Sequence, residues 1–220
     1  MRIVKIVLIV SIFISCSTKN ANEDSKKNGK PAIKKEDSPR VEKKQLPILK
    51  TNIDIQPFKG ISADIVNFVY SELRKVHPDV RLLKPIPLPK RAYYPKRNRY
   101  RADTLIYIMR GQTKDGRVTV GLTNKDISTD NGNIPDWGVM GLGYQPGKSC
   151  VVSTFRLSKR NLKEQYFKVA IHELGHTQGL PHCPNKTCLM TDAEGKNNTD
   201  KENGFCEKCK AFLIAKGWKL

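Results

Sequence analysis

The alternation of apolar and polar residues predicts a series of short β-strands in the middle of the chain. Residues 50–56 place Ile53 and Ile55 between polar neighbours, which is the period-two pattern of a half-buried strand. Further strands, rich in β-branched and aromatic residues, are predicted at four segments: residues 80–83, 104–109, 118–122 and 151–155. Residues 124–148 are rich in Gly, Asn and Asp and predict a long loop.

A helical repeat of apolar positions predicts three helices. Residues 61–76 carry a stripe of apolar side chains, with Ser62 as the N-cap and His77-Pro78 as the stop. A second helix is predicted from Ser158 to about Gln178, before Gly179, and a third over residues 206–215. Because this order shows no βαβ repeat, the predicted fold is α+β, with helices around one mixed sheet.

The N-terminus has the composition of an export signal. Arg2 and Lys5 precede an apolar stretch of nine residues, 6–14, which is too short to span a bilayer but suits a secretory signal. Cys16 follows directly after Ser15, and this arrangement resembles a bacterial lipoprotein signal, in which Cys16 would be lipidated. An ordinary secretory signal or an uncleaved membrane anchor is the alternative.

Three segments follow from this assignment. We expect a signal peptide over residues 1–15 and a lipid-anchored tether over residues 16–45, whose polar composition cannot offset the entropy of folding. The folded domain would then cover residues 46–220. The protein would lie in the bacterial cell envelope, attached to the membrane through Cys16.

The chain is strongly basic, with a formal net charge of +19. Such an excess could favour nucleic acid, an anionic membrane surface or acidic substrates. The densest basic cluster in the folded part, residues 84–101, also contains three tyrosines and four prolines. Its composition resembles a platform for single-stranded nucleic acid, but the prolines favour an extended, ordered connection. We therefore expect no nucleic-acid partner.

Three of the four histidines lie within residues 172–182. His172 and His176 are four residues apart, so a helix presents them on one face, with Glu173 beside the first. His182 follows after Gly179, whose lack of a Cβ permits the turn that brings it back. Three imidazoles leave one position of a tetrahedral zinc open, as a catalytic site requires. Glu173 would then be the general base for a zinc-activated water.

The remaining cysteines predict a second metal site. Cys183 and Cys188 form a C-x4-C pair, and Cys206 and Cys209 form a C-x2-C pair. Two such pairs are typical of a structural zinc, whereas an exported protein could instead form two disulfides. Close pairs on turns bind a metal more readily than they meet disulfide geometry, which favours zinc. Cys150 stands alone in a predicted strand.

The combined motif H-E-x-G-H-x-x-G-x-x-H-C, followed by the second cysteine, Met190 and C-x2-C, resembles the archaemetzincin family of metzincin peptidases. Residues 94–100 and 141–157 are also similar to that family, so the resemblance covers about residues 48–220. It implies a mixed sheet with a backing helix, an active-site helix and a small C-terminal subdomain around the four-cysteine zinc site. It also implies that Met190 is the methionine beneath the catalytic zinc.

These observations predict a monomeric zinc metallopeptidase that holds two Zn²⁺ per chain and acts on peptides or proteins. Residues 135–144 and the loop after Cys188 are the expected walls of its substrate site. The alternative is a catalytically silent, zinc-bound module of the same fold that only binds peptides.

Overall fold

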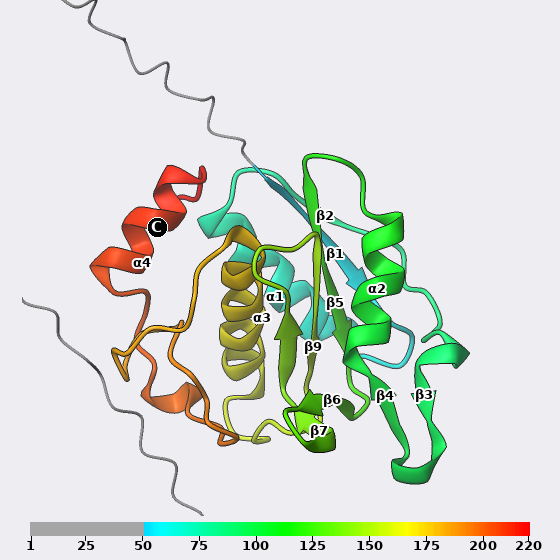
Figure 1. Cartoon of the computed structure of the whole chain (residues 1–220). Coiled ribbons are helices and arrows are strands. Elements are labelled where there is room, and N and C mark those ends of the chain that lie inside the picture. Colours follow the sequence, from blue (N-terminus) through cyan, green and yellow to red (C-terminus); the bar gives the residue numbers. More distant parts are fainter. Residues whose placement is uncertain (1–50) are drawn as a thin grey trace, which may run out of the picture. The chain divides into compact units, whose positions relative to one another are not determined.

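A five-stranded sheet organises the part of the chain that the computed structural model describes, residues 51–220 (Figure 1). Its strand order is β2-β1-β5-β9-β8. Strands β1, β2, β5 and β9 run parallel, and β8 pairs antiparallel with β9 at one edge. The bounds are β1 (Asn52–Pro57), β2 (Val80–Leu82), β5 (Arg117–Thr123), β8 (Gly141–Gly143) and β9 (Ser149–Ser153). The sheet is mixed, as predicted.

Helices cover both faces of this sheet (Figure 1). Helices α1 (Ala63–Val76) and α3 (Leu162–Gln178) pack on one face, and α2 (Ala102–Gln112) packs on the other. Alternation along β9 separates the two cores, because Cys150 and Val152 belong to the core under α1 and α3 while Val151 faces α2. Helix α3 thus backs onto β9, next to the edge strand β8.

A smaller sheet extends the molecule beside β8. Its order is β3-β4-β6-β7, formed by β3 (Tyr93–Tyr94), β4 (Arg99–Arg101), β6 (Ile127–Asn131) and β7 (Ile134–Val139). The basic cluster predicted as an extended connection contributes β3, β4 and the short 3-10 helices η1 (Lys90–Ala92) and η2 (Pro95–Arg97). Two of its arginines are used internally, since Arg99 binds Asp126 and Asp136, and Arg101 binds Asp130.

The C-terminal segment wraps around α3 from the other side (Figure 1). It contains the 3-10 helix η3 (Thr199–Lys201) and helix α4 (Glu207–Ala215). Leu213 and Trp218 are buried in the same core as α1 and α3, which attaches this end of the chain to the domain.

Residues 104–109, predicted as a strand, lie instead in α2. The buried side chains there are Ala102, Leu105, Ile106 and Met109, which have helical spacing, while Tyr107 between them is 68% exposed. The β-like composition of the segment masked this repeat. Packing of one helical face on the sheet outweighs intrinsic strand propensity here.

Three further predictions need correction. Residues 124–148 are not one long loop, because they contain β6, β7 and β8. A second sheet exists, and β1, α1 and the parallel neighbour β2 form a βαβ unit that the sequence did not reveal. The second helix begins at Leu162, after Asn161 in a left-handed conformation (φ 56°), rather than at Ser158.

Two features of the described residues bear on the predictions for the N-terminus and for stability. No helix within residues 51–220 is long and apolar enough to cross a membrane. The predicted signal, Cys16 and the tether lie outside the described residues. On β1 of the large sheet, buried Asp54 accepts hydrogen bonds from Arg81 (2.8 and 2.7 Å) and Arg117 (2.7 Å).

Candidate metal centres

Helix α3 is fixed to the sheet by the hydroxyl of Tyr166, which is fully buried. This hydroxyl accepts a hydrogen bond from the backbone N–H of Thr123 (2.9 Å) and donates to the carbonyl of Val152 (3.0 Å). The helix then ends at Gly179, whose φ of 104° lies in the left-handed region that favours glycine. The reversal of the chain there returns His182 to the face that carries His172 and His176.

The three histidines converge with a ligand nitrogen of each within 4.8 Å of the others. His172 Nδ1 donates to the carbonyl of Leu189 (2.6 Å), and His176 Nδ1 donates to that of Leu180 (2.8 Å). Since a carbonyl only accepts, both Nε2 atoms keep a free lone pair, and they lie 3.0 Å apart. His182 is half exposed, with its Nδ1 3.4 Å from Asp192 Oδ2. Such outer partners orient imidazoles toward a metal.

Burial keeps the imidazoles of His172 and His176 neutral. It lowers the pKa of His172 to about 4, with His176 adding to the effect. Burial also lowers the pKa of His176. A neutral imidazole is the form that binds a transition metal, so the donor set fits zinc at physiological pH.

Glu173 lies against the edge strand β8. Its carboxyl group is buried, and burial raises its pKa to about 8; a divalent cation at the histidines would lower that value. A Cβ built on Gly141 would stand 2.6 Å from Glu173 Oε1, and one on Gly143 would stand 2.7 Å from its backbone oxygen. The two glycines therefore let β8 approach Glu173 closely.

Met190 packs directly under the histidines. It is fully buried, and a Cβ built on Gly175 would stand 2.5 Å from its Sδ. Gly175 lies between His172 and His176 on α3, so the missing side chain leaves the space that the methionine fills. The sulfur packs here against the helix at Gly175.

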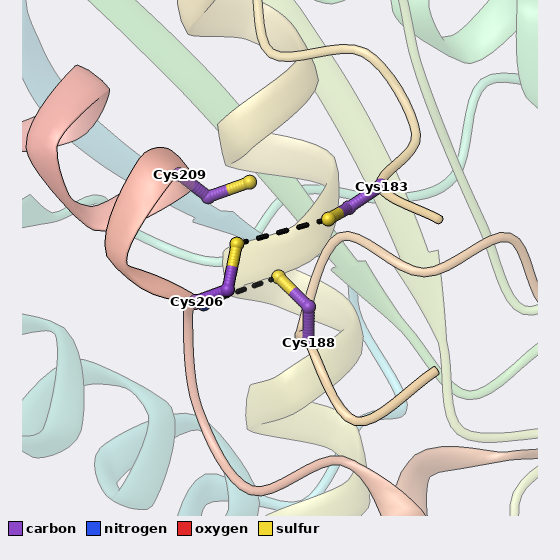
Figure 2. A group of neighbouring side chains, drawn as sticks. All are labelled: Cys183, Cys188, Cys206 and Cys209. Carbon is purple, nitrogen blue, oxygen red and sulfur yellow. Dashed lines mark hydrogen bonds between the residues drawn. The ribbon is translucent and has the colours of Figure 1, made fainter. Parts of the chain in front are cut away.

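The four cysteines form a second cluster, shown in Figure 2. Cys183 and Cys188 come from the chain after α3, and Cys206 and Cys209 come from the start of α4. Their sulfurs lie within 4.8 Å of one another, and the Cys183 and Cys206 sulfurs are 3.7 Å apart. Tetrahedral ligands at about 2.3 Å from a zinc ion lie about 3.8 Å apart, so the spacing fits that metal. No disulfide joins the cysteines of the described residues.

The surroundings of Cys206 also suit a thiolate, whereas burial raises the pKa of Cys188 and of Cys209. The backbone N–H of Cys209 lowers the pKa of Cys206 to about 7. Cys206 is the N-cap residue of α4, and a helix N-terminus stabilises a thiolate. The cluster is joined to the histidine site through the backbone, because the Cys183 N–H donates to the Met190 carbonyl (2.7 Å).

A pocket of about 970 Å³ opens over the histidines and Glu173. One wall is formed by the β6–β7 hairpin and β8, including Trp137–Gly143, and the other by residues 191–199. Residues 137–143 and 191–199 fall in the segments that the sequence predicted, whereas residues 129–131 of β6 add to the first wall from outside them. The walls meet where Gly195 lies against Trp137, since a Cβ on Gly195 would stand 3.0 Å from the indole ring.

Comparison with known proteins agrees with this architecture. The model of "Peptidase family M54" matches residues 53–214. This chain belongs to that family. It is 32% identical over 177 residues to an archaemetzincin of Haloarcula marismortui, covering 74% of this chain and 99% of that relative.

Solved archaemetzincin structures have the same fold. That of Methanopyrus kandleri matches with a TM-score of 0.64 at 27% identity, covering 76% of this chain and 96% of its own. That of Archaeoglobus fulgidus, complexed with malonate, matches with a TM-score of 0.63 at 28% identity, covering 74% and 99%. The chain is accordingly a member of a zinc metallopeptidase family, as its motif predicted.

Two polar residues of this archaemetzincin site escaped the sequence analysis. Lys168 lines the pocket one helical turn before His172, and its spacing from His172 and His176 could have indicated this. Glu202 also lines the pocket, although it comes from the polar connection before α4. No sequence pattern marks it, because its position depends on how that connection folds back onto α3.

Proposed function

We propose that His172, His176 and His182 hold a catalytic zinc in this archaemetzincin and that Glu173 is its general base. The convergence of the three imidazoles beside the buried Glu173 carries the proposal. A zinc ion bound there supplies Lewis acidity, which polarises a peptide carbonyl and acidifies water.

The chain's own groups account for the proton transfers. Glu173 accepts a proton from the attacking water and delivers it to the nitrogen of the departing amine. Its carboxyl group is held by α3 on one side and by the glycines of β8 on the other, which limits its movement. The Nδ1 bonds of His172 and His176 keep the two rings oriented throughout.

The edge strand β8 is the proposed binding surface for the substrate backbone. Within the described residues its only strand partner is β9, so the opposite edge can pair with an extended peptide. Gly141–Gly143 also line the pocket next to Glu173. A peptide added along this edge would bring its carbonyl groups past the base.

Cleavage of a broad peptide library tests the peptidase against the silent binding module. We expect the zinc-loaded protein to cut peptides at defined bonds, and Glu173→Gln to leave them intact. A wild-type protein that binds peptides yet leaves every one whole would support the binding module instead.

We further propose that Cys183, Cys188, Cys206 and Cys209 hold a second, structural zinc. The four sulfurs lie together, and they anchor the segment that carries His182 and Met190. Metal analysis should find two zinc ions per wild-type chain, and Cys209→Ser should lose at least one. One zinc per chain, with no titratable thiol among these four cysteines, would show two disulfides instead.

The N-terminal proposals rest on sequence alone. We propose that Cys16 is lipidated and holds the enzyme in the bacterial cell envelope, with residues 16–45 as its tether. Full-length protein expressed in a bacterial host should then partition into detergent, and Cys16→Ser should not. A monomer is also proposed, because a single chain supplies every ligand at both sites; sedimentation of the domain would test it.

A further inference from the structure

The charged side chains along the pocket wall are mostly paired or exposed. Lys196 is exposed, and Asp192 lies beside His182. Three other charges of the wall are neutralised by ion pairs between 2.9 and 3.0 Å: Arg156 with Asp126, Asp130 with Arg101, and Glu194 with Lys186. Because these charges are already paired, the hairpin side of the pocket offers few ionic contacts to a substrate.

Glu202 differs from these charged residues because its side chain is both buried and unpaired. Its residue is 7% exposed and lines the pocket, and its carboxylate makes no hydrogen bond or ion pair with any other residue of the described range, 51–220. Burial raises its pKa to about 7, while the charge of Lys168 acts in the opposite direction. A largely buried carboxylate without a protein partner is poorly solvated, so a cation that enters the pocket would stabilise it.

Lys168 does not fill that role, although its charge acts on Glu202. Its Nζ donates to the backbone carbonyls of Thr199 and Glu202, both at 2.7 Å. These bonds tie the segment before α4 to helix α3 and direct the ammonium group to the main chain. Glu202 is thereby held in the pocket wall beside α3, in the segment bound by Lys168, which itself lies one helical turn before His172.

We propose that Glu202 is a specificity-determining residue that binds the ammonium or guanidinium group of a Lys or Arg side chain next to the cleaved peptide bond. The inference rests on the proposed function, because it places that bond over the histidines. A long side chain can extend from there to the wall one helical turn away. The charge and the hydrogen-bonding capacity of Glu202 match a cation better than a neutral or acidic side chain.

Matched peptide pairs test this proposal. Each pair is N-acetylated and differs only by Lys against norleucine, or Arg against citrulline, at one of the two positions that flank the cleaved bond. The wild-type kcat/KM should favour the cationic peptide by about 10- to 100-fold at one of these positions, the range for one charged hydrogen bond. Glu202→Gln should lose that preference and retain turnover of the norleucine peptide.

The control variant is Glu164→Gln, which removes an exposed carboxylate from the first turn of α3 outside the pocket. It should keep the wild-type preference, which separates a local effect from a change in net charge. An equal loss in both variants would overturn the proposal. A wild type that shows no preference for the cationic peptide would also overturn it. A preference found only for peptides with a free N-terminus would do the same, because it would show that Glu202 binds the terminal amine.

Two further measurements test the role of Glu202 separately from peptide cleavage and from folding. Calorimetry with the zinc-loaded Glu173→Gln protein should show tighter binding of the lysine peptide than of the norleucine peptide, even if no peptide is ever cleaved. Failure of cleavage alone would therefore count against the proposed function and not against Glu202. Because Gln removes a buried unpaired charge, the Tm of Glu202→Gln should not fall. A lower Tm would indicate a structural role and overturn the proposal.

Discussion

Adding one methyl group at Gly175 tests the packing between the active-site helix and Met190. A Cβ there would stand 2.5 Å from Met190 Sδ and 3.2 Å from its Cε, so the methionine must move by about 1 Å to restore ordinary contact. Gly→Ala inside a helix normally stabilises it by about 1 kcal/mol, whereas overpacking a core costs about 1–3 kcal/mol. We expect a net loss of about 0–2 kcal/mol.

Gly111→Ala is the matched control, because Gly111 also lies in a helix and has nothing within 4 Å of the added Cβ. It should gain up to about 1 kcal/mol. Denaturant unfolding of the zinc-loaded variants measures both effects. Zinc affinity of Gly175→Ala, measured by chelator competition, should fall about 10- to 100-fold, because a shifted Met190 disturbs the neighbouring Leu189 carbonyl that orients His172.

A double-mutant cycle assigns the effect to the sulfur. In a Met190→Ala background the obstructing atoms are gone, so Gly175→Ala should become neutral or stabilising. If Gly175→Ala changed the free energy of unfolding equally in both backgrounds, the packing argument would be refuted.

Three further outcomes are expected. Gly143→Ala should lower kcat/KM by about 100-fold with zinc content unchanged, because a displaced β8 moves the wall of the site against Glu173 by about 1 Å; normal kinetics would contradict this. Tyr166→Phe should lose about 1–3 kcal/mol in denaturant unfolding, since it leaves buried backbone groups unpaired; unchanged stability would argue against that role. Asp54→Asn should lessen the loss of stability at acid pH, measured by thermal unfolding from pH 7 to pH 2; an unaltered pH profile would contradict it.

The sign of the Asp54 effect follows from its surroundings. Burial by itself raises the pKa of Asp54, but the hydrogen bonds and charges of Arg81 and Arg117 outweigh burial and lower it below its usual value. A carboxylate with a lowered folded-state pKa contributes stability above its unfolded pKa, near 3.9, and that contribution is lost as the pH falls through the folded value. Replacement by Asn removes this titration.

The convergence of the three histidines and of the four cysteines was predictable because their spacing is local. His172 and His176 share a helix, Gly179 marks the turn, and the cysteine pairs are each a few residues apart, so sequence separation almost sets their geometry. The helices α1, α3 and α4 and most strands of the large sheet were predicted for the same reason, since each has its own apolar repeat.

What escaped prediction depends on contacts between distant segments. Residues 102–112 have a strand-like composition and become a helix because one face packs on β5 and β9. The small sheet forms from polar, glycine-rich residues, held by ion pairs such as Arg99–Asp126 that no local pattern signals. Glu202 lines the pocket because its segment folds back onto α3, where Lys168 binds the segment's carbonyls.

Turnover by Glu173→Gln is the most direct test of the central claim that this archaemetzincin cleaves peptides with Glu173 as the base. The measurement is kcat/KM on a peptide that the wild type cleaves, made on protein whose zinc content has been determined. We expect a loss of at least about 100-fold with the metal content of the wild type. Activity within a few-fold of wild type at full zinc content would contradict the account.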